Sequence, residues 1–298
     1  MKYTLSKQVK DAINNNKPVL ALESTIIASG MPYPENIKFY NKAVDVCQGF
    51  GVVPATVAII RGEIHIGLSR RKLEHIATSK SVHKVSKREI GVCLYKKLSG
   101  ATTVSSTSHI AHSLGIRVFS TGGIGGVHRG YNDTMDMSQD LLSLQNTPII
   151  VISSGVKSFL DVEKTVETLE TMGVTQLGFN TNRFPLFYSA KSKIKLAHSV
   201  KKTEDVIGVY NKNIACGIMS SVLVLNPVPK TKEIPSKTIN KIISKSIVKM
   251  KKENIVGKNT TPFLLSEISR LTKNKSLKTN ISLALNNIRL GAEIACGL

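Results

Sequence analysis

The chain lacks tryptophan entirely, and aromatic residues make up only 5% of its 298 residues. Proteins that bind single-stranded nucleic acid stack the bases on aromatic side chains, so this scarcity argues against such a protein. The sequence also has no run of about 18 apolar residues, which is the length that a membrane span requires. Its first residues are polar and lack the apolar core of a secretion signal. We therefore expect a cytoplasmic protein without a membrane partner.

Cysteine is scarce as well. The four cysteines lie far apart in the sequence and form no C-x-x-C pair; they are Cys47, Cys93, Cys216 and Cys296. Isolated thiols of this kind are typical of a reduced, cytosolic protein and exclude a disulfide scaffold.

Acidic residues are few, since 20 Asp and Glu stand against 41 Lys and Arg, and the formal net charge is +21. A charge of this size is typical of nucleic-acid-binding proteins. Here, however, the lysines are scattered, and those of 191–202 and 230–258 alternate with apolar and small residues as on solvated helix faces. We interpret the charge as a lysine-rich surface that attracts an anionic substrate, and we expect no nucleic-acid partner.

The sequence does contain an alternation of apolar strands and amphipathic helices. Short apolar runs predict strands at 18–23, 55–60, 64–67, 82–86, 116–120, 148–153, 174–179 and 219–225. Helical spacing predicts helices at 34–49, 69–76 (capped by Ser69), 86 to about 98, 103–114, 161–172 (capped by Asp161), and almost throughout 235–298 with breaks near 257–262 and 273–276. We therefore predict an α/β fold: an α/β/α sandwich with a central, mainly parallel sheet and a helical C-terminal part, in a single domain over residues 1–298.

The segment 120–130 is the most informative of the chain, because it holds four glycines in five residues directly after a predicted strand. Glycines leave the backbone N–H groups free to approach a ligand. The segment matches neither the Rossmann pattern G-x-G-x-x-G nor the Walker pattern G-x-x-x-x-G-K-[ST] in its required context. A tight turn would explain the glycines alone. With His128, Arg129, Asp136 and Asp140 added, we expect a metal-assisted site for a phosphorylated small molecule.

Two further candidates stand at predicted strand ends. Glu23 ends the predicted strand 18–23, where burial would raise the pKa of its carboxyl and suit a general acid; the alternative is a strand-end carboxylate satisfied by the backbone of Ser24 and Thr25. Lys157 closely follows the strand 148–153, where a lysine can lose its proton and form a Schiff base with a carbonyl. The alternative for Lys157 is a side chain that extends its charge into solvent from a helix start.

Asp136 and Asp140 are candidate metal ligands. If 135–142 is helical, residues four apart share one face, and two carboxylates near a glycine loop can hold Mg²⁺ or Mn²⁺. The alternative is that both charges complement the dipole at a helix start.

Polar groups elsewhere suit a phosphate and a base. Lys84 and the hydroxyl-rich run 102–107, which includes Thr103, are typical of a phosphate site, although such a run is also a common capping sequence. The C-terminal helical stretch carries three asparagines, any of which could recognise a base edge if it points inward or could lie on the surface: Asn280, Asn286 and Asn287.

Ten ordered motifs carry a resemblance to a known family; they lie at 22–27, 30–34, 54–60, 84–86, 100–104, 120–130, 155–157, 226–229, 261–265 and 276–281. With them the chain resembles the pseudouridine-5′-phosphate glycosidase family, also called the indigoidine-synthase-A-like family, from about residue 8 to residue 297. The resemblance implies an α/β/α fold, a homotrimer and a divalent metal, usually Mn²⁺. It also implies reversible cleavage of pseudouridine 5′-phosphate to uracil and ribose 5-phosphate. Such an enzyme is a glycosidase by activity and a carbon–oxygen lyase by formal class.

The resemblance further implies a role for individual residues. Lys157 corresponds to the lysine that forms the Schiff base, Glu23 to the proton donor, Asp136 to the metal ligand and His128 to an imidazole beside the sugar. The implied substrate contacts are Lys84, Val104, Ser138, Gln139, Asp140 and Asn280, to which we add Thr103; we count Asp140 among the catalytic residues as well. A C–C glycosidic bond has no leaving heteroatom to protonate, so hydrolysis by two carboxylates is unsuitable. The amine of Lys157 would instead bond to C1′ of the opened ribose, and its lone pair would form an iminium there as the C1′–C5 bond breaks and Glu23 protonates C5 of the base.

The sequence departs from the family pattern at Gln139, where alanine is common, and in 189–193 and 217–221. Two alternatives stay open. A Schiff-base lyase or aldolase acting on another sugar phosphate would keep Lys157 but would not need Asn280. A basic nucleic-acid-binding protein would bind RNA with a salt-dependent affinity and would not need Lys157 at all.

Overall fold

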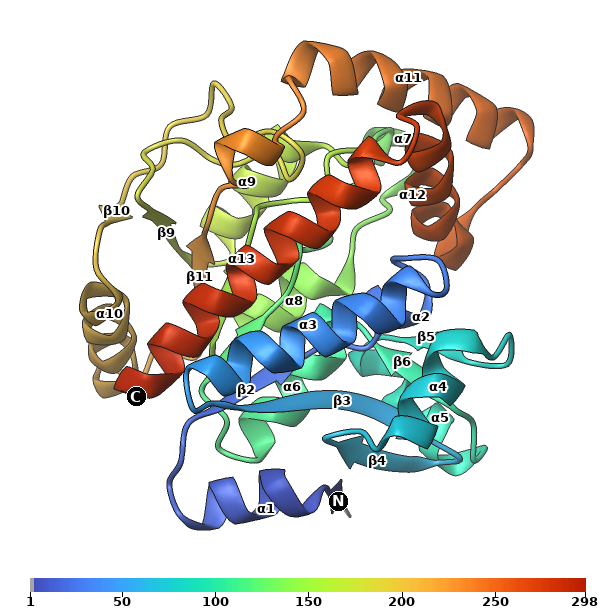
Figure 1. Cartoon of the computed structure of the whole chain (residues 1–298). Coiled ribbons are helices and arrows are strands. Elements are labelled where there is room, and N and C mark those ends of the chain that lie inside the picture. The colour runs from blue at the N-terminus through green and yellow to red at the C-terminus, as the bar shows by residue number, and fades with distance from the viewer. Residues whose placement is uncertain (1–2) are drawn as a thin grey trace.

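The computed structural model describes residues 3–298, which form an eleven-stranded β-sheet between layers of helices (Figure 1). The strands are β1 (Tyr3–Leu5), β2 (Val19–Leu22), β3 (Val53–Ile60), β4 (Glu63–Ile66), β5 (His83–Val85), β6 (Gly100–Thr102), β7 (Val118–Ser120), β8 (Ile150–Ser153), β9 (Thr175–Phe179), β10 (Ser199–Val200) and β11 (Val222–Leu225). Within the described residues, the pairings are parallel except those of β3 with β4 and with β6. The predicted α/β class with a mainly parallel sheet is confirmed.

The order of the strands determines where loops can gather. Along the sheet the order is β1-β4-β3-β2-β7-β8-β11-β9-β10, and β6 and β5 branch from β3. Strand β2 pairs with β3 on one side and with β7 on the other, so the course of the chain across the sheet reverses between β2 and β7. At such a reversal the loops at the carboxyl ends of the strands diverge and leave a crevice, which is where parallel sheets bind ligands.

The predicted strands are confirmed, with ends that differ by a few residues. Strands β8 and β11 are buried over their whole lengths, as expected for strands covered on both faces. Strands β3 and β4 form a hairpin, and its turn residues Arg61 and Gly62 have φ of 49° and 79°, the left-handed backbone that a two-residue hairpin needs. Strands β1, β6 and β10 were not predicted, because two or three residues are too few to show a period.

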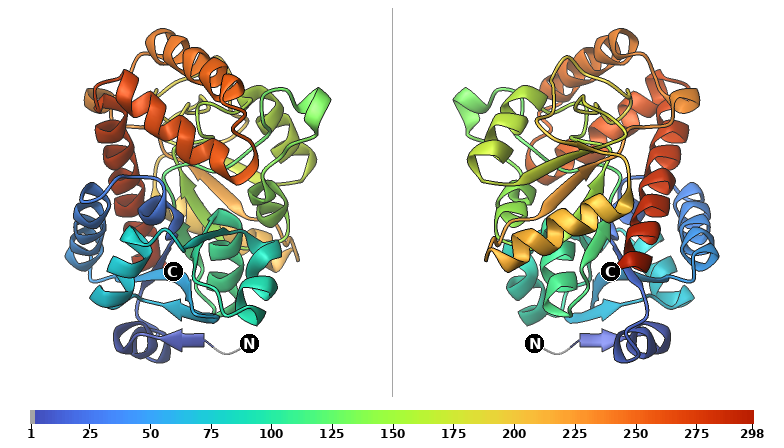
Figure 2. Two further views of the ribbon diagram at one scale, coloured as in Figure 1. Left: turned by 90° about the vertical axis from the view of Figure 1, so that its right-hand side faces the viewer. Right: turned by 90° about the vertical axis from the view of Figure 1, so that its left-hand side faces the viewer.

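Helices cover both faces of the sheet. They are α1 (Lys7–Asn14), α2 (Thr25–Ala28), α3 (Glu35–Gly49), α4 (Arg70–Thr78), α5 (Ile90–Tyr95), α6 (Val104–Ser113), α7 (Tyr131–Thr134), α8 (Gln139–Gln145), α9 (Val162–Thr171), α10 (Thr203–Ala215), α11 (Ser236–Lys252), α12 (Thr260–Leu271) and α13 (Lys275–Gly297), with short 3₁₀ turns η1 (Lys87–Glu89), η2 (Lys230–Lys232) and η3 (Gly257–Asn259). Helices α3 and α13 lie on one face, and α6, α8 and α9 lie on the other (Figure 2). Asp161 caps α9 as predicted, whereas the Ser69 hydroxyl precedes α4 without making a capping bond.

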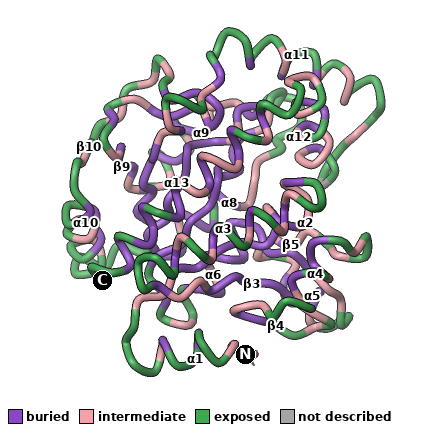
Figure 3. Tube along the Cα trace, viewed as in Figure 1, coloured by how far each residue is buried: buried purple, intermediate pink, exposed green. Residues whose placement is uncertain are grey.

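The C-terminal part is helical with the predicted breaks. Helices α11 and α12 are separated at η3, and α12 and α13 at Lys273 and Asn274, which both have positive φ. Helix α13 crosses the sheet in contact with β2, β7 and β8, and the buried part of the chain concentrates beneath it (Figure 3). No helix within residues 3–298 is long and apolar enough to cross a membrane.

Candidate active site

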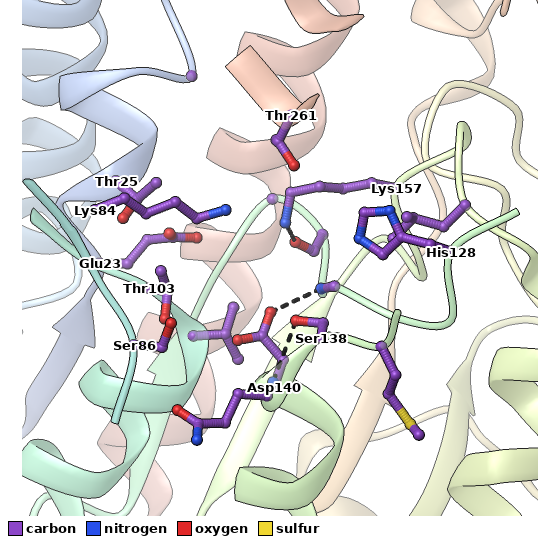
Figure 4. Close-up of a pocket in the computed structure, with 18 of the residues that line it drawn as sticks. Glu23, Thr25, Lys84, Ser86, Thr103, His128, Ser138, Asp140, Lys157 and Thr261 are labelled. Carbon is purple, nitrogen blue, oxygen red and sulfur yellow. Dashed lines mark hydrogen bonds between the residues drawn. The ribbon is translucent and has the colours of Figure 1, made fainter. Parts of the chain in front are cut away.

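A cavity of about 530 Å³ lies where β2, β7 and β8 end, and helices α12 and α13 complete its wall. The residues predicted to be catalytic, to contact the substrate or to bind the metal line this cavity: Glu23, Lys84, Thr103, Val104, His128, Asp136, Ser138, Gln139, Asp140, Lys157 and Asn280. Figure 4 labels Glu23, Lys84, Thr103, His128, Ser138, Asp140 and Lys157. Residues as distant in sequence as Glu23 and Asn280 thus meet at the carboxyl edge of the sheet, at the reversal between β2 and β7. The prediction that Arg129 belongs to the site is wrong, because Arg129 lines a separate cavity and its guanidinium donates to the carbonyls of Leu160 and Ser158 at 3.4 and 3.3 Å.

Glu23 is buried at the end of β2. Burial raises the pKa of its carboxyl above the ordinary value of 4.5, and the charge of Lys157 and a hydrogen bond from Thr121 oppose that shift. The Thr121 hydroxyl donates this bond to Oε1 of Glu23. The hydroxyls of Ser24 and Thr25 bond the backbone of Thr102 instead, at 2.9 and 2.8 Å. Glu23 is therefore placed as a general acid requires, and the direction of its pKa shift favours the protonated form.

Lys157 reaches the cavity from the loop that follows β8. Its ammonium donates a hydrogen bond to the carbonyl of Gly123 (Figure 4). Its backbone is fixed as well, because the Lys157 N–H donates to the carbonyl of Ile124 at 3.1 Å, and the Ile124 N–H donates to the carbonyl of Gly155 at 3.0 Å. The lysine is half-buried and faces the cavity, so it does not simply extend into solvent from a helix start.

The glycine loop has no room for side chains at several positions, because neighbouring residues approach its backbone closely. A Cβ on Gly125 would collide with the Ser138 side chain and come within 2.8 Å of Oδ2 of Asp140. A Cβ on Gly123 would meet the ring of Phe187 at 2.5 Å. The loop can therefore bring its backbone N–H groups against side chains that a larger residue would push away.

The predicted pairing of Asp136 and Asp140 on one helix face is wrong. Helix α8 begins only at Gln139, with the Ser138 hydroxyl as its cap, and Met135 has a left-handed φ of 51°. Asp140 is buried, and its two oxygens accept the backbone N–H of Gly125 at 2.8 Å and of Ser105 at 3.0 Å. This carboxylate thus holds the glycine loop against the start of α6.

Asp136 instead faces His128. Their side chains approach to 3.6 Å between Nδ1 and Oδ2, and the Asp136 carboxylate is 52% exposed. Burial lowers the pKa of His128, an effect that Asp136 opposes and Lys84 reinforces. Within residues 3–298 no group of three or more His, Cys, Asp or Glu side chains could enclose a metal ion. An exposed single carboxylate beside a cavity still suits Mg²⁺ or Mn²⁺, which keep most of their water and need few protein ligands.

The hydroxyl-rich run 102–107 is only partly available to a ligand. The hydroxyls of Thr102 and Ser106 donate to the carbonyls of Val57 and Val85 at 2.7 and 2.6 Å. From this run, Thr103 and Val104 line the cavity, where Lys84 lies beside them. The run therefore acts largely as a capping sequence, and Thr103 is its residue at the site.

The three asparagines of α13 differ in what they contact. Asn287 is fully buried and donates to the carbonyl of Thr121 at 2.8 Å, so it fixes the glycine loop. Asn286 donates to the carbonyl of Pro227 at 3.3 Å. Asn280 lines the cavity, and its buried Oδ1 has no hydrogen-bond partner among the described residues. Asn280 is thus the asparagine with an acceptor available to a ligand.

Sequence reasoning missed the contact between Gln139 and Arg88. Oε1 of Gln139 accepts the backbone N–H of Arg88 at 2.8 Å, and both residues line the cavity. The longer side chain at position 139 therefore ties η1 to α8, which an alanine could not do. No motif marks Arg88, and only the folded arrangement of η1 places it at the rim.

A lysine and a buried carboxylic acid that face one cavity, at the carboxyl edge of a parallel sheet, define an α/β enzyme acting on a small molecule. Comparison with known proteins agrees with this class. Residues 8–297 match the family model described as indigoidine synthase A like protein. The chain therefore belongs to the indigoidine synthase A-like family.

Relatives and solved structures similar to this chain cover nearly its whole length. It is 46% identical to a pseudouridine-5′-phosphate glycosidase of Caldanaerobacter subterraneus over 99% of this chain and 96% of the relative, and 44% identical to one of Staphylococcus aureus over 97% and 94%. An indigoidine synthase A-like protein of Thermotoga maritima superposes with a TM-score of 0.89 at 36% identity, covering 94% of this chain and 92% of that one. The prealnumycin C-glycosynthase AlnA, in complex with ribulose 5-phosphate, superposes with a TM-score of 0.91 at 31% identity, covering 99% and 96%.

Proposed function

We propose that this enzyme reversibly cleaves the C–C glycosidic bond of pseudouridine 5′-phosphate to give uracil and ribose 5-phosphate. The observation that carries the proposal is the pairing of Lys157, a nucleophile at a strand end, with Glu23, a buried acid of raised pKa, in one cavity. The names of the relatives support the same substrate.

The reaction follows from these two groups. The neutral amine of Lys157 attacks C1′ of the ribose, the C1′–O4′ bond breaks, and O4′ takes a proton. The C1′–C5 bond is then replaced by a C5–H bond whose proton comes from Glu23, and C1′ is left as an iminium on Lys157. Water hydrolyses the iminium, which frees Lys157 and releases ribose 5-phosphate. In the reverse direction the Glu23 carboxylate removes the C5 proton of uracil.

The remaining residues of the cavity suit the two ends of the substrate. Lys84 and Thr103 offer a charge and a hydroxyl to the phosphate. The Oδ1 atom of Asn280, which has no partner among the described residues, can accept an N–H of uracil. The net charge of +21 raises the local concentration of such an anionic substrate.

Asp136 is the residue that would hold a divalent cation such as Mn²⁺. Its carboxylate is exposed at the cavity and approaches His128 to 3.6 Å, whereas each oxygen of Asp140 accepts a backbone N–H. When bound, the cation would supply positive charge beside the sugar phosphate.

The direct test is incubation of the protein with pseudouridine 5′-phosphate and Mn²⁺, with uracil release followed by chromatography. We expect uracil and ribose 5-phosphate in equal amounts, and none from Lys157→Ala. Lys164→Ala serves as the matched control, since Lys164 is a partly exposed lysine of α9 outside the cavity. Absence of uracil with the parent protein would refute the proposal.

The structural similarity to a C-glycosynthase that binds ribulose 5-phosphate favours a second candidate, a Schiff-base enzyme acting on another sugar phosphate. The two candidates differ in the need for Asn280. Only a glycosidase that recognises uracil should lose activity in Asn280→Ala while still forming a borohydride-trappable imine with ribose 5-phosphate.

We also propose that the enzyme is a homotrimer of the cytoplasm, as the family resemblance implies. Size-exclusion chromatography coupled to light scattering should give a mass about three times the 32.4 kDa of one chain.

A further inference from the structure

The first turn of α8 ties three walls of the active-site cavity together. Asp140 accepts the N–H groups of Gly125 in the glycine loop and of Ser105 in α6. Gln139, the residue before it, accepts the N–H of Arg88 in η1 at 2.8 Å. Two adjacent side chains of α8 therefore hold the glycine loop, α6 and η1 around one cavity.

Turn η1 brings polar side chains to this cavity. Ser86, directly before η1, and Arg88 within it both line the cavity. Lys84 and Thr103, to which we assign the phosphate, line it as well. Ser86 lies beside Thr103 (Figure 4), since the Thr103 N–H donates to the carbonyl of Val85 at 3.1 Å. The turn therefore forms part of the wall that we assign to the phosphate.

Both side chains at the turn have hydrogen-bond donors left for a ligand. In the capping box of η1 the Ser86 hydroxyl acts as an acceptor, so its own proton remains available. The Arg88 guanidinium donates to Oε1 of Glu89 through Nε at 2.7 Å, and neither of its NH₂ groups donates to a described residue. Phosphate oxygens accept such donors, and hydrogen bonds between charged groups are among the strongest.

A turn of three residues depends on its neighbours for its position. Two backbone N–H groups of η1 donate to other elements of the described chain: Lys87 to Oγ of Ser105 at 3.2 Å, and Arg88 to Oε1 of Gln139 at 2.8 Å. Without the Gln139 oxygen, a water molecule can satisfy the Arg88 N–H, but it does not tie η1 to α8. Of these two bonds only the longer one would then hold the turn.

We propose that Gln139 makes this enzyme selective for a phosphorylated substrate by fixing η1, and with it Ser86 and Arg88, at the phosphate. The proposal rests on the proposed function and deepens it, because it assigns the selectivity to a position where the sequence departs from the family pattern. Gln139 acts through η1 and is a positioning residue. Lys157 and Glu23 make their hydrogen bonds with other segments, so their chemistry should not depend on it.

Replacing Gln139 by methionine keeps the length of the side chain and removes the acceptor. We expect KM for pseudouridine 5′-phosphate to rise about fivefold or more while kcat stays close to the parental value, because the lost contact serves binding and not the chemical step. The kcat/KM for free pseudouridine, which has no phosphate, should be unchanged. A parental KM for the nucleotide, or an equal loss of kcat/KM for both substrates, would overturn the proposal.

Gln145→Met is the matched control. Gln145 ends the same helix, is likewise partly buried, and does not line the cavity. This variant should keep the parental constants for both substrates. A loss of the preference for the nucleotide in Gln145→Met as large as in Gln139→Met would show that any change in α8 suffices, and would overturn the role of Gln139.

Hydrogen–deuterium exchange at the Arg88 amide tests the contact without any activity. The amide should exchange about tenfold faster or more in Gln139→Met than in the parent, because it loses its hydrogen bond. Gln139→Glu keeps an acceptor oxygen and should retain the parental exchange. Equal exchange in Gln139→Met and the parent would overturn the proposal.

Calorimetric titration with inorganic phosphate separates this proposal from the proposed function. The parent should bind phosphate about fivefold more tightly or better than Gln139→Met. If the parent releases no uracil from pseudouridine 5′-phosphate, the proposed function fails, while the titration still decides whether Gln139 supports a phosphate site. Equal affinities of the two proteins for phosphate would overturn that role.

Discussion

Replacing Glu23 by glutamine separates proton transfer from every other contribution of this side chain. The amide has the shape of the carboxyl, and its oxygen can still accept the hydrogen bond from Thr121. It cannot donate a proton to C5 of the base. Removing a general acid typically lowers the rate by a factor of about 10²–10⁴, which corresponds to about 3–5 kcal/mol in the activation barrier. Substrate binding and formation of the bond between C1′ and the Lys157 nitrogen should persist.

The assay follows from this separation. Glu23→Gln is mixed with pseudouridine 5′-phosphate, reduced with borohydride and weighed by intact-protein mass spectrometry. We expect an adduct on Lys157 that still carries the base. Glu74→Gln, an exposed glutamate of α4, is the control and should release uracil like the parent. Uracil release by Glu23→Gln at near the parental rate would refute the assignment, and His128 would be the next candidate for the acid.

The same substitution has a pH-dependent effect on stability. Because burial raises the pKa of Glu23 in the folded protein above 4.5, its contribution to stability is fully present below pH 4.5 and is lost as the pH rises through the raised value. Glutamine does not ionise, so Glu23→Gln should unfold at a higher temperature than the parent at pH 8, and this difference should shrink at pH 4. Cleavage by the parent should decline as the pH rises through the same pKa. A variant less stable than the parent at pH 8 would contradict the burial argument.

The remaining predictions concern other groups of the cavity. Lys157→Arg should form no borohydride-trappable adduct, because a guanidinium stays protonated; intact mass after reduction checks this. EDTA should abolish activity and Mn²⁺ should restore it. Asp136→Ala should need a far higher Mn²⁺ concentration to reach half of its maximal activity in a titration. Full activity after chelation would refute a metal role. The phosphorylated substrate should be preferred over the free nucleoside about a hundredfold or more, since charge-assisted contacts contribute about 1.5–3 kcal/mol each. Lys84→Met should lose most of this preference. Measurement of kcat/KM for both substrates checks both expectations. Asp140→Asn should lower the free energy of unfolding by about 1–3 kcal/mol, because one of two buried N–H groups loses its acceptor, whereas the exposed Asp133→Asn should leave the denaturant midpoint unchanged.

Much of the fold could be predicted because its signals are local. The apolar runs that became β8 and β11 have the continuous hydrophobicity of strands covered on both faces. The location of the site followed from the same logic, since Glu23 and Lys157 stand directly or closely after strands, and the carboxyl ends of parallel strands meet at one edge.

What the sequence could not reveal depends on contacts between distant segments. Asp136 and Asp140 have helical spacing, yet the capping hydroxyl of Ser138 starts α8 between them. Asn280 and Asn287 are seven residues apart on one face of α13, and only packing decides that one fixes the glycine loop while the other lines the cavity. The bond between Gln139 and Arg88 likewise joins residues that no short motif relates.

The cavity cannot be complete during synthesis of the chain until helix α13 has been made. Glu23, the glycine loop and Lys157 are all translated long before residue 275, yet Asn287, which holds the loop through the carbonyl of Thr121, and Asn280, which completes the cavity, arrive only with this helix. In a nascent chain whose α13 has not yet emerged from the ribosome, one face of β2, β7 and β8 would be uncovered. The proposed nucleophile and acid would then exist without a complete cavity, so a partly made chain holds both residues but cannot use them as the finished enzyme does.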